Sequence, residues 1–282
     1  MRRAFSPRKS EMIFGAFTLI FLSLFACLYY FGKSPAMLTI LMFTPAASVL
    51  IAKAVTKEGF SDLRLKPNFK GNLKWYLSAY FLTPLVAFFG AGVYFVIFRS
   101  DWDPLLSVYA ASCETTSAGE YIGRLCVMLP LAALVNPVAG ILQCFGEELA
   151  WRGYLLPKLK GKFGYKTAVV LDGVIWGAWH APIIAMGYNY GNEHPLLGIP
   201  AMTALCVVLG VIEAFLYEKT RSVWCPTAFH AALNGMDMYS PSSLFMSAEP
   251  DPFIGPDLIG IIGGMGFVII AAVIFTVYKP KV

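Results

Sequence analysis

The stretch Leu125–Arg152 reads LCVMLPLAALVNPVAGILQCFGEELAWR, and it indicates the fold class more clearly than any other part of the chain. No charged residue precedes Glu147 in this run, and about 20 apolar residues are enough for a helix to cross the hydrocarbon core of a bilayer. The run ends in the adjacent acids Glu147 and Glu148, with Arg152 one helical turn later. Ionisable residues are costly in membrane segments and by default mark a functional site. The stretch therefore predicts a membrane-spanning helix with a functional site at its end.

The composition of the whole chain agrees with this prediction. Of its 282 residues, 57% are hydrophobic and 14% are charged, whereas about 25% are charged in a typical soluble domain. Long apolar runs without period-2 alternation favour helices over a β-barrel. We therefore predict an all-α fold, a polytopic membrane helical bundle in which residues 1–282 form a single integral membrane domain. About eight transmembrane helices are expected, near residues 11–31, 36–55, 75–98, 122–144, 167–187, 197–217, 224–240 and 257–278.

The distribution of charge predicts how this bundle is oriented. Loops on the cytosolic side of a membrane are enriched in Lys and Arg. Basic residues gather near both chain ends and in alternate loops: Arg2, Arg3, Arg8, Lys9, Lys57, Arg64, Lys66, Lys70, Lys74, Lys158, Lys160, Lys162, Lys166, Lys219, Arg221, Lys279 and Lys281. With an even number of spans, both termini are then cytosolic. Because these residues stand in short loops beside spans, the net charge of +5 predicts no nucleic-acid partner.

The stretch 57–74 is too charged to cross the membrane, and two interpretations of it remain open. It is either an amphipathic segment lying on the cytosolic face or a solvated basic loop.

Helical spacing separates the two acids at the end of the first stretch. Glu148 and Arg152 are four residues apart, and a Glu that precedes a cation at this spacing forms a favourable pair on one face of a helix. Glu147 points about 100° away from Glu148 and has no such partner in its own helix. We therefore predict that Glu148 supports Arg152 and that Glu147 is free for proton chemistry.

Two further apolar segments each carry a pair of functional side chains at the same spacing. Trp176 and His180 are four residues apart, so the indole can pack beside the imidazole and orient it. His230 and Asn234 are also four apart and place two hydrogen-bonding groups on one face. Only three histidines occur in the chain, and two of them belong to these pairs. We predict that the three segments meet around a polar cavity in the cytosolic half of the bundle.

These groups are sufficient for hydrolysis of a peptide bond by an activated water. A buried carboxylate is a stronger base than an exposed one, so Glu147 can take a proton from a water that His180 helps to hold. His230 and Asn234 can donate hydrogen bonds to the oxyanion that develops on the amide carbonyl. This chemistry requires neither a serine nor a cysteine nucleophile.

The three motifs also carry a family resemblance. Glu-Glu-x-x-x-Arg followed by Gly-Tyr-Leu-x-Pro, aromatic-x-x-x-His and His-x-x-x-Asn resemble the type II CAAX prenyl endopeptidases, a group within the CAAX proteases and bacteriocin-processing enzymes. The resemblance covers about residues 122–240, and it departs from the family at Trp176, where Phe is usual. It implies a glutamate-type intramembrane protease that releases the last three residues of a prenylated substrate. It also implies catalytic roles for the four residues Glu147, His180, His230 and Asn234, supported by Glu148, Arg152 and Trp176.

The resemblance leaves several alternatives open. A metal-dependent protease could bind Zn²⁺ through Glu147, Glu148, His180 and His230, although the chain lacks the H-E-x-x-H motif; no cofactor is expected, but zinc is not excluded. A non-catalytic scaffold or bacteriocin-immunity protein and a transporter are the other candidates. The expected partners are a prenylated C-terminal peptide and the lipid bilayer, and the expected location is a prokaryotic plasma membrane.

Two further acids, Asp172 and Glu213, also fall within or near predicted spans. Asp172 is expected to orient His180 because it lies eight residues earlier on roughly the same face. Glu213 is expected near a helix end, in a pair with a Lys or an Arg.

Overall fold

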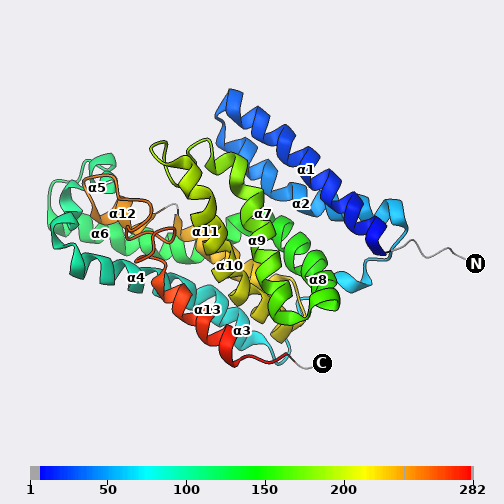
Figure 1. The fold of residues 1–282 in the computed structure, drawn as a ribbon. Helices are drawn as coiled ribbons and strands as arrows, with labels where there is room; N and C mark the ends of the chain where they lie inside the picture. Colours follow the sequence, from blue (N-terminus) through cyan, green and yellow to red (C-terminus); the bar gives the residue numbers. More distant parts are fainter. Residues whose placement is uncertain (1–6, 238, 281–282) are drawn as a thin grey trace, which may run out of the picture.

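The protein is described by a computed structural model over residues 7–237 and 239–280, and this part of the chain contains helices and loops without any β-strand (Figure 1). α1 (Pro7–Gly32) and α2 (Pro35–Thr56) form an antiparallel hairpin on one side of the bundle. α3 (Leu73–Leu77), the π-helical turn η2 (Ser78–Leu82) and α4 (Thr83–Ile97) then form one continuous helix. Short elements follow, η3 (Arg99–Asp101), η4 (Pro104–Leu106) and α5 (Val108–Ser112).

One long helical segment carries the Glu-Glu pair. It comprises α6 (Ala118–Pro130), the π-helical turn η5 (Leu131–Val135), α7 (Asn136–Glu148), a second π-helical turn η6 (Leu149–Leu155) and α8 (Leu156–Phe163). Glu147 and Glu148 therefore lie at the junction between α7 and η6, and Arg152 lies inside η6. π-Helical turns within α-helices occur frequently at functional sites.

The remaining helices complete the core around that junction. They are α9 (Tyr165–Ile184), α10 (Pro195–Thr220), α11 (Trp224–Asp237), α12 (Pro241–Phe245) and α13 (Met265–Val277). α9 and α10 approach closely at two glycines four residues apart. A Cβ atom added to Gly173 would lie 2.6 Å from the Cα of Val207, and one added to Gly177 would lie 2.4 Å from the Cα of Thr203. Small residues at this spacing allow membrane helices to pack backbone to backbone.

The predicted all-α, polytopic class is confirmed. Among the described residues, six helical segments are long and apolar enough to cross a membrane: Lys9–Gly32, Pro35–Thr56, Leu73–Ile97, Ala118–Phe163, Tyr165–Ile184 and Pro195–Thr220. They correspond to the first six of the eight expected spans.

The last two expected spans are shorter as helices than the sequence predicts. α11 has 14 residues and α13 has 13, so each is only about 20 Å long. Every residue of α11 from Cys225 to Leu233 is buried, so this apolar segment is a core helix enclosed by its neighbours. Residues 257–264 contain three glycines and form turns in place of the start of a helix.

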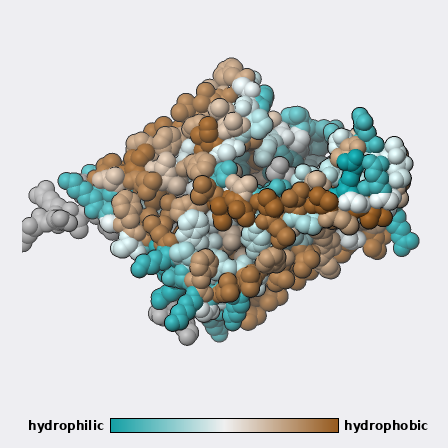
Figure 2. Space-filling view, turned by 180° about the vertical axis from the view of Figure 1, so that it is seen from behind, coloured by the Kyte–Doolittle hydropathy of each residue, from teal (hydrophilic) through white to brown (hydrophobic). Residues whose placement is uncertain are grey.

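Polar residues gather at the two ends of the molecule, with a broad apolar surface between them (Figure 2). α1 begins and α13 ends at the same end of the bundle, where α8 also lies (Figure 1). This arrangement suits the even number of crossings that the charge pattern predicts. Arg2, Arg3 and Lys281, which belong to that pattern, lie outside the described residues, and the side of the membrane that each end faces stays a prediction.

The stretch 57–74 is an ordered loop. It contains one short 3₁₀ turn, η1 (Ser61–Leu63), and it packs against the connection between α10 and α11. The indole of Trp224 donates a hydrogen bond to the carbonyl of Leu65 at 2.8 Å, and the backbone N–H of Val223 donates to the carbonyl of Arg64 at 3.2 Å. Before α3 begins at Leu73, the described residues of this stretch form no α-helix, which favours the loop interpretation.

Candidate active site

A fully buried arginine organises the centre of the bundle. The guanidinium of Arg152 lies 3.1 Å from Glu148 and 3.7 Å from Asp172, and it forms a close ion pair with Glu213. Its flat face lies 4.3 Å from the ring centre of Trp176. The planar, permanently charged guanidinium can bind several carboxylates and an aromatic face at the same time. Arg152 therefore connects four helical segments, α7, η6, α9 and α10.

The contacts of this arginine test three of the predictions from spacing. The predicted pair of Glu148 with Arg152 is confirmed. The predicted pairing of Glu213 with a cation is also confirmed, although Glu213 lies in the interior of α10 and not near its end. The prediction that Asp172 orients His180 is wrong, because Asp172 faces Arg152. Eight steps of 100° leave Asp172 about 80° away from His180 around α9.

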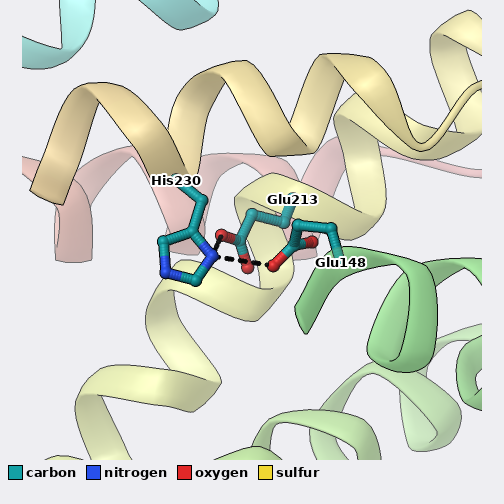
Figure 3. A group of neighbouring side chains, drawn as sticks. All are labelled: Glu148, Glu213 and His230. Atoms are coloured by element: carbon teal, nitrogen blue, oxygen red, sulfur yellow. Dashed lines mark hydrogen bonds and ion pairs between the residues drawn. The ribbon is translucent and has the colours of Figure 1, made fainter. Parts of the chain in front are cut away.

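His230 is held by the same acidic cluster (Figure 3). Its Nδ1 lies 3.0 Å from Oε1 of Glu148 and 4.0 Å from Oε1 of Glu213. Nδ1–H donates to the Glu148 carboxylate, which fixes the orientation of the ring and leaves Nε2 as the second nitrogen. Glu148 is thus shared between Arg152 and His230, so its role extends beyond the support of Arg152 that the sequence predicts.

Glu147 makes a different set of contacts. Its Oε2 accepts a hydrogen bond of 2.7 Å from the indole nitrogen of Trp176, and the described residues give its Oε1 no hydrogen-bond partner. The side chain is only 2% exposed. The predicted contrast between the two acids therefore holds in part: Glu147 has no cationic partner within the described residues, but a tryptophan holds one of its oxygens.

Trp176 contacts both histidines of the cavity as well as Glu147. Its ring centre is 5.9 Å from that of His180 and 5.4 Å from that of His230. The predicted contact between Trp176 and His180 is confirmed. His180 Nδ1 lies 2.9 Å from the carbonyl of Trp176, so Nδ1–H donates to it and Nε2 is left as the nitrogen able to accept a proton. The hydrogen bond from Trp176 to Glu147 could not be predicted from spacing, because it joins α9 to α7.

Side chains from all three motif-bearing segments line one cavity of about 290 Å³. Glu147, His180, His230 and Asn234 all line it, together with Trp176. The amide of Asn234 donates to the sulfur of Cys144 at 3.5 Å. Apart from these polar groups, the walls are mainly Leu, Ile and Met side chains from α2, α9, α10 and α11. Three further lining residues with polar groups, Tyr188, Asn189 and Asp237, carry no motif signal in the sequence.

Three of the buried groups have the geometry to hold a metal ion, since the ligand atoms of Glu148, Glu213 and His230 lie within 4.8 Å of one another. This set differs from the four ligands expected from sequence, because Glu147 and His180 are replaced by Glu213. Arg152 already contacts both carboxylates of the group. A divalent cation between them would lie beside a permanent positive charge in a medium of low dielectric constant. The donor set therefore suits the guanidinium better than a zinc ion.

Comparison with known proteins covers the part of the chain that forms this site. Residues 126–236 match the model of a family described as type II CAAX prenyl endopeptidase Rce1-like. A curated relative, CAAX prenyl protease 2 of Methanococcus maripaludis, is 29% identical over 93 residues, which cover 31% of this chain and 34% of the relative. The match thus spans about a third of the length of that relative. The matched segment carries both glutamates, Arg152, His180 and His230, and it is similar to the type II CAAX prenyl endopeptidase Rce1-like family.

Proposed function

We propose that the protein is an intramembrane endopeptidase that cleaves a prenylated CAAX-type substrate near its C-terminus and releases the last three residues. One observation carries the proposal: Glu147, His180, His230 and Asn234, from three different helices, line a single cavity with apolar walls. The family match and the name of the archaeal relative support the substrate class. Apolar walls suit a substrate that carries a lipid.

The proposed reaction begins with a water held between Glu147 and His180. The free Oε1 of Glu147 takes a proton from this water as its oxygen attacks the carbonyl carbon of the scissile amide. Nε2 of His180 accepts the second hydrogen bond of the water and fixes its direction of attack. The C–N bond then breaks, and the proton held by Glu147 passes to the leaving amine. Water is the only co-reactant that these steps consume.

The negative charge that develops on the carbonyl oxygen must be stabilised by hydrogen-bond donors. The amide of Asn234 supplies one, and Nε2 of His230 supplies a second when the ring is protonated. An imidazolium at this position would lie between Glu148 and Glu213, and buried charges persist only where such partners compensate them. The cluster around Arg152 would in this way support catalysis from outside the cavity. We propose that the reaction needs no metal ion.

The same proposal includes a location. The match to a protein of Methanococcus maripaludis and the six candidate spans are compatible with a prokaryotic plasma membrane. The basic residues around α8 and at the end of α10 favour placing that end of the bundle in the cytosol. The cavity, however, is lined by Leu38 near the start of α2 and by Tyr188 and Asn189, which follow α9, so it lies toward the other end of these helices. The predicted placement of the cavity in the cytosolic half therefore does not agree with this orientation.

Purified full-length protein tests the proposal with farnesylated and geranylgeranylated CAAX peptides and with matched peptides that carry no lipid. We expect cleavage after the prenylated cysteine, loss of cleavage in His180→Ala, and little cleavage of the unmodified peptides. Activity should survive a chelator. If no prenylated peptide is cleaved while the protein remains folded, the proposed peptidase function is wrong. If the chelator abolishes activity and zinc restores it, the reaction is metal-dependent.

Replacement of Trp176 by phenylalanine tests whether the indole positions the proposed base. The ring packing is retained, but the 2.7 Å hydrogen bond to Glu147 is lost. A hydrogen bond to a charged group contributes about 1.5–3 kcal/mol, so kcat should fall by about 10- to 150-fold with little change in KM. Steady-state kinetics on the prenylated peptide separates the two parameters.

The matched control for this variant is Trp179→Phe. The indole of Trp179 also packs on His180, at 4.9 Å between ring centres, but its nitrogen has no hydrogen-bond partner among the described residues. The same chemical change there should leave kcat within a few-fold of the wild-type value. Equal losses in the two variants would show that only aromatic packing matters.

A further inference from the structure

A second cavity, of about 140 Å³, lies further along α10 than the candidate active site, toward the C-terminal end of that helix. It is bounded by the continuous helix α3–η2–α4, by α10, by α13 and by Phe229 of α11, and it shares no lining residue with the first cavity. Its walls are almost entirely apolar and include Leu82, Val86, Ile212, Phe267 and Ile270. A water molecule occupies about 30 Å³, so the cavity has room for roughly five groups of the size of a water molecule. This volume suits part of a single hydrocarbon chain.

The cavity opens toward the surface that would face lipid. Leu82, which lines it, is 52% exposed, and η2–α4 and α10 both belong to segments that can cross a membrane. In a bilayer the hydrocarbon chains are the molecules next to such a surface. The occupant that matches the walls is therefore an acyl chain.

One end of the cavity carries an aromatic cluster with a lysine at its centre. Trp75 and Phe215, which both line the cavity, are 5.3 Å apart between ring centres, and Tyr278 lies 5.0 Å from Phe215. Nζ of Lys219 is 5.7, 5.2 and 4.9 Å from the ring centres of Trp75, Phe215 and Tyr278. Trp, Tyr and Lys together are typical of the level at which lipid head groups meet the hydrocarbon core.

No carboxylate of the described residues pairs with the positive charge at this end of the cavity. A second lysine, Lys74, lies 5.2 Å from the ring centre of Trp75, and both lysines are exposed. Within the described residues neither lysine forms an ion pair with a carboxylate. The nearby Glu218 is engaged by Lys160 at 3.0 Å. An anion bound at the cavity mouth could therefore form ion pairs with both Lys74 and Lys219.

We propose that this groove binds an anionic phospholipid, with one acyl chain in the cavity and the phosphate on Lys219 and Lys74. Basic pockets between membrane helices are suited to anionic head groups, because the charge lies at the depth of the phosphate. The apolar cavity and the paired lysines are separate observations, and each specifies one end of the same molecule. The inference does not depend on the proposed peptidase activity.

The test uses the full-length protein in a neutral detergent, with lipid binding followed by native mass spectrometry. Phosphatidylglycerol should bind more tightly than phosphatidylcholine of the same chain length. Lys219→Gln and Lys74→Gln should each weaken the binding of phosphatidylglycerol about fivefold, since a basic residue near the phosphate contributes about that factor. Lys70→Gln is the matched control: it removes the same charge from an exposed residue in the preceding loop and should leave binding unchanged.

Two further measurements separate the lipid from a simple phosphate. Soluble glycerol phosphate should not compete, because it has no acyl chain to fill the cavity. Ser78→Phe, which places a ring in the cavity, should weaken both phospholipids while the lysine residues stay intact. Equal binding of the two lipids, equal effects of Lys70→Gln and Lys219→Gln, or full competition by glycerol phosphate would each overturn the proposal. The lysine variants lie on the surface, so the test stands even if Ser78→Phe does not fold.

Discussion

Arg152→Met is expected to destabilise the protein more than any other single substitution in the bundle. The side chain is fully buried and contacts Glu148, Asp172 and Glu213. Removing one partner of a buried ion pair costs about 3–5 kcal/mol, because the charge that remains has lost its compensation. Three acids lose the same cation here. We expect a large fall in the yield of folded protein and in the unfolding temperature of the fraction that is purified.

The chain offers a matched control for this prediction. Arg124 pairs with Glu120 at 2.9 Å, with the same four-residue spacing and the same order of charges, but both side chains are exposed. Arg124→Met should change the unfolding temperature little, because exposed ion pairs contribute little to stability. Arg152→Lys should be intermediate, since it keeps the charge and loses the planar group that contacts several acids. If Arg152→Met unfolds at the wild-type temperature, the buried cluster does not hold the helices together.

The sequence predicts the features of this cluster that lie within one helix. The pair of Glu148 with Arg152 follows from a spacing of four residues, and it is observed despite the π-helical turn between them. The contact of Trp176 with His180 follows in the same way. The helical class follows from apolar runs, because a membrane leaves few other ways to satisfy the backbone.

Contacts that join different helices could not be predicted from the spacing of residues within one helix. Asp172 and Glu213 meet at Arg152 only because α9 and α10 pack closely, and no pattern within one helix specifies which faces turn toward each other. The hydrogen bond from Trp176 to Glu147 depends on the same packing. Hydropathy also cannot separate a buried core helix from a span, which is why α11 was expected to be longer.

Glu147→Gln is expected to abolish most of the peptidase activity while the protein stays folded. Gln has the same shape and keeps an oxygen that can accept the hydrogen bond from Trp176, so the local structure should be retained. It cannot take a proton from water at neutral pH. Positioned acid–base catalysis contributes about 10²- to 10⁴-fold, and we expect kcat on the prenylated peptide to fall by that factor. The unfolding temperature should stay close to that of the wild type.

Glu148→Gln is the control against which the Glu147→Gln result is compared. The two acids are adjacent and both are buried, but Glu148 contacts Arg152 and His230, whereas Glu147 contacts the neutral indole of Trp176. Removing the charge of Glu148 should therefore lower the unfolding temperature as well as the activity. Of the two acids, only Glu147 is expected to give a loss of activity without a loss of stability. If the two variants lose stability equally, both acids belong to the structural cluster, and the base must be sought among the other residues of the cavity.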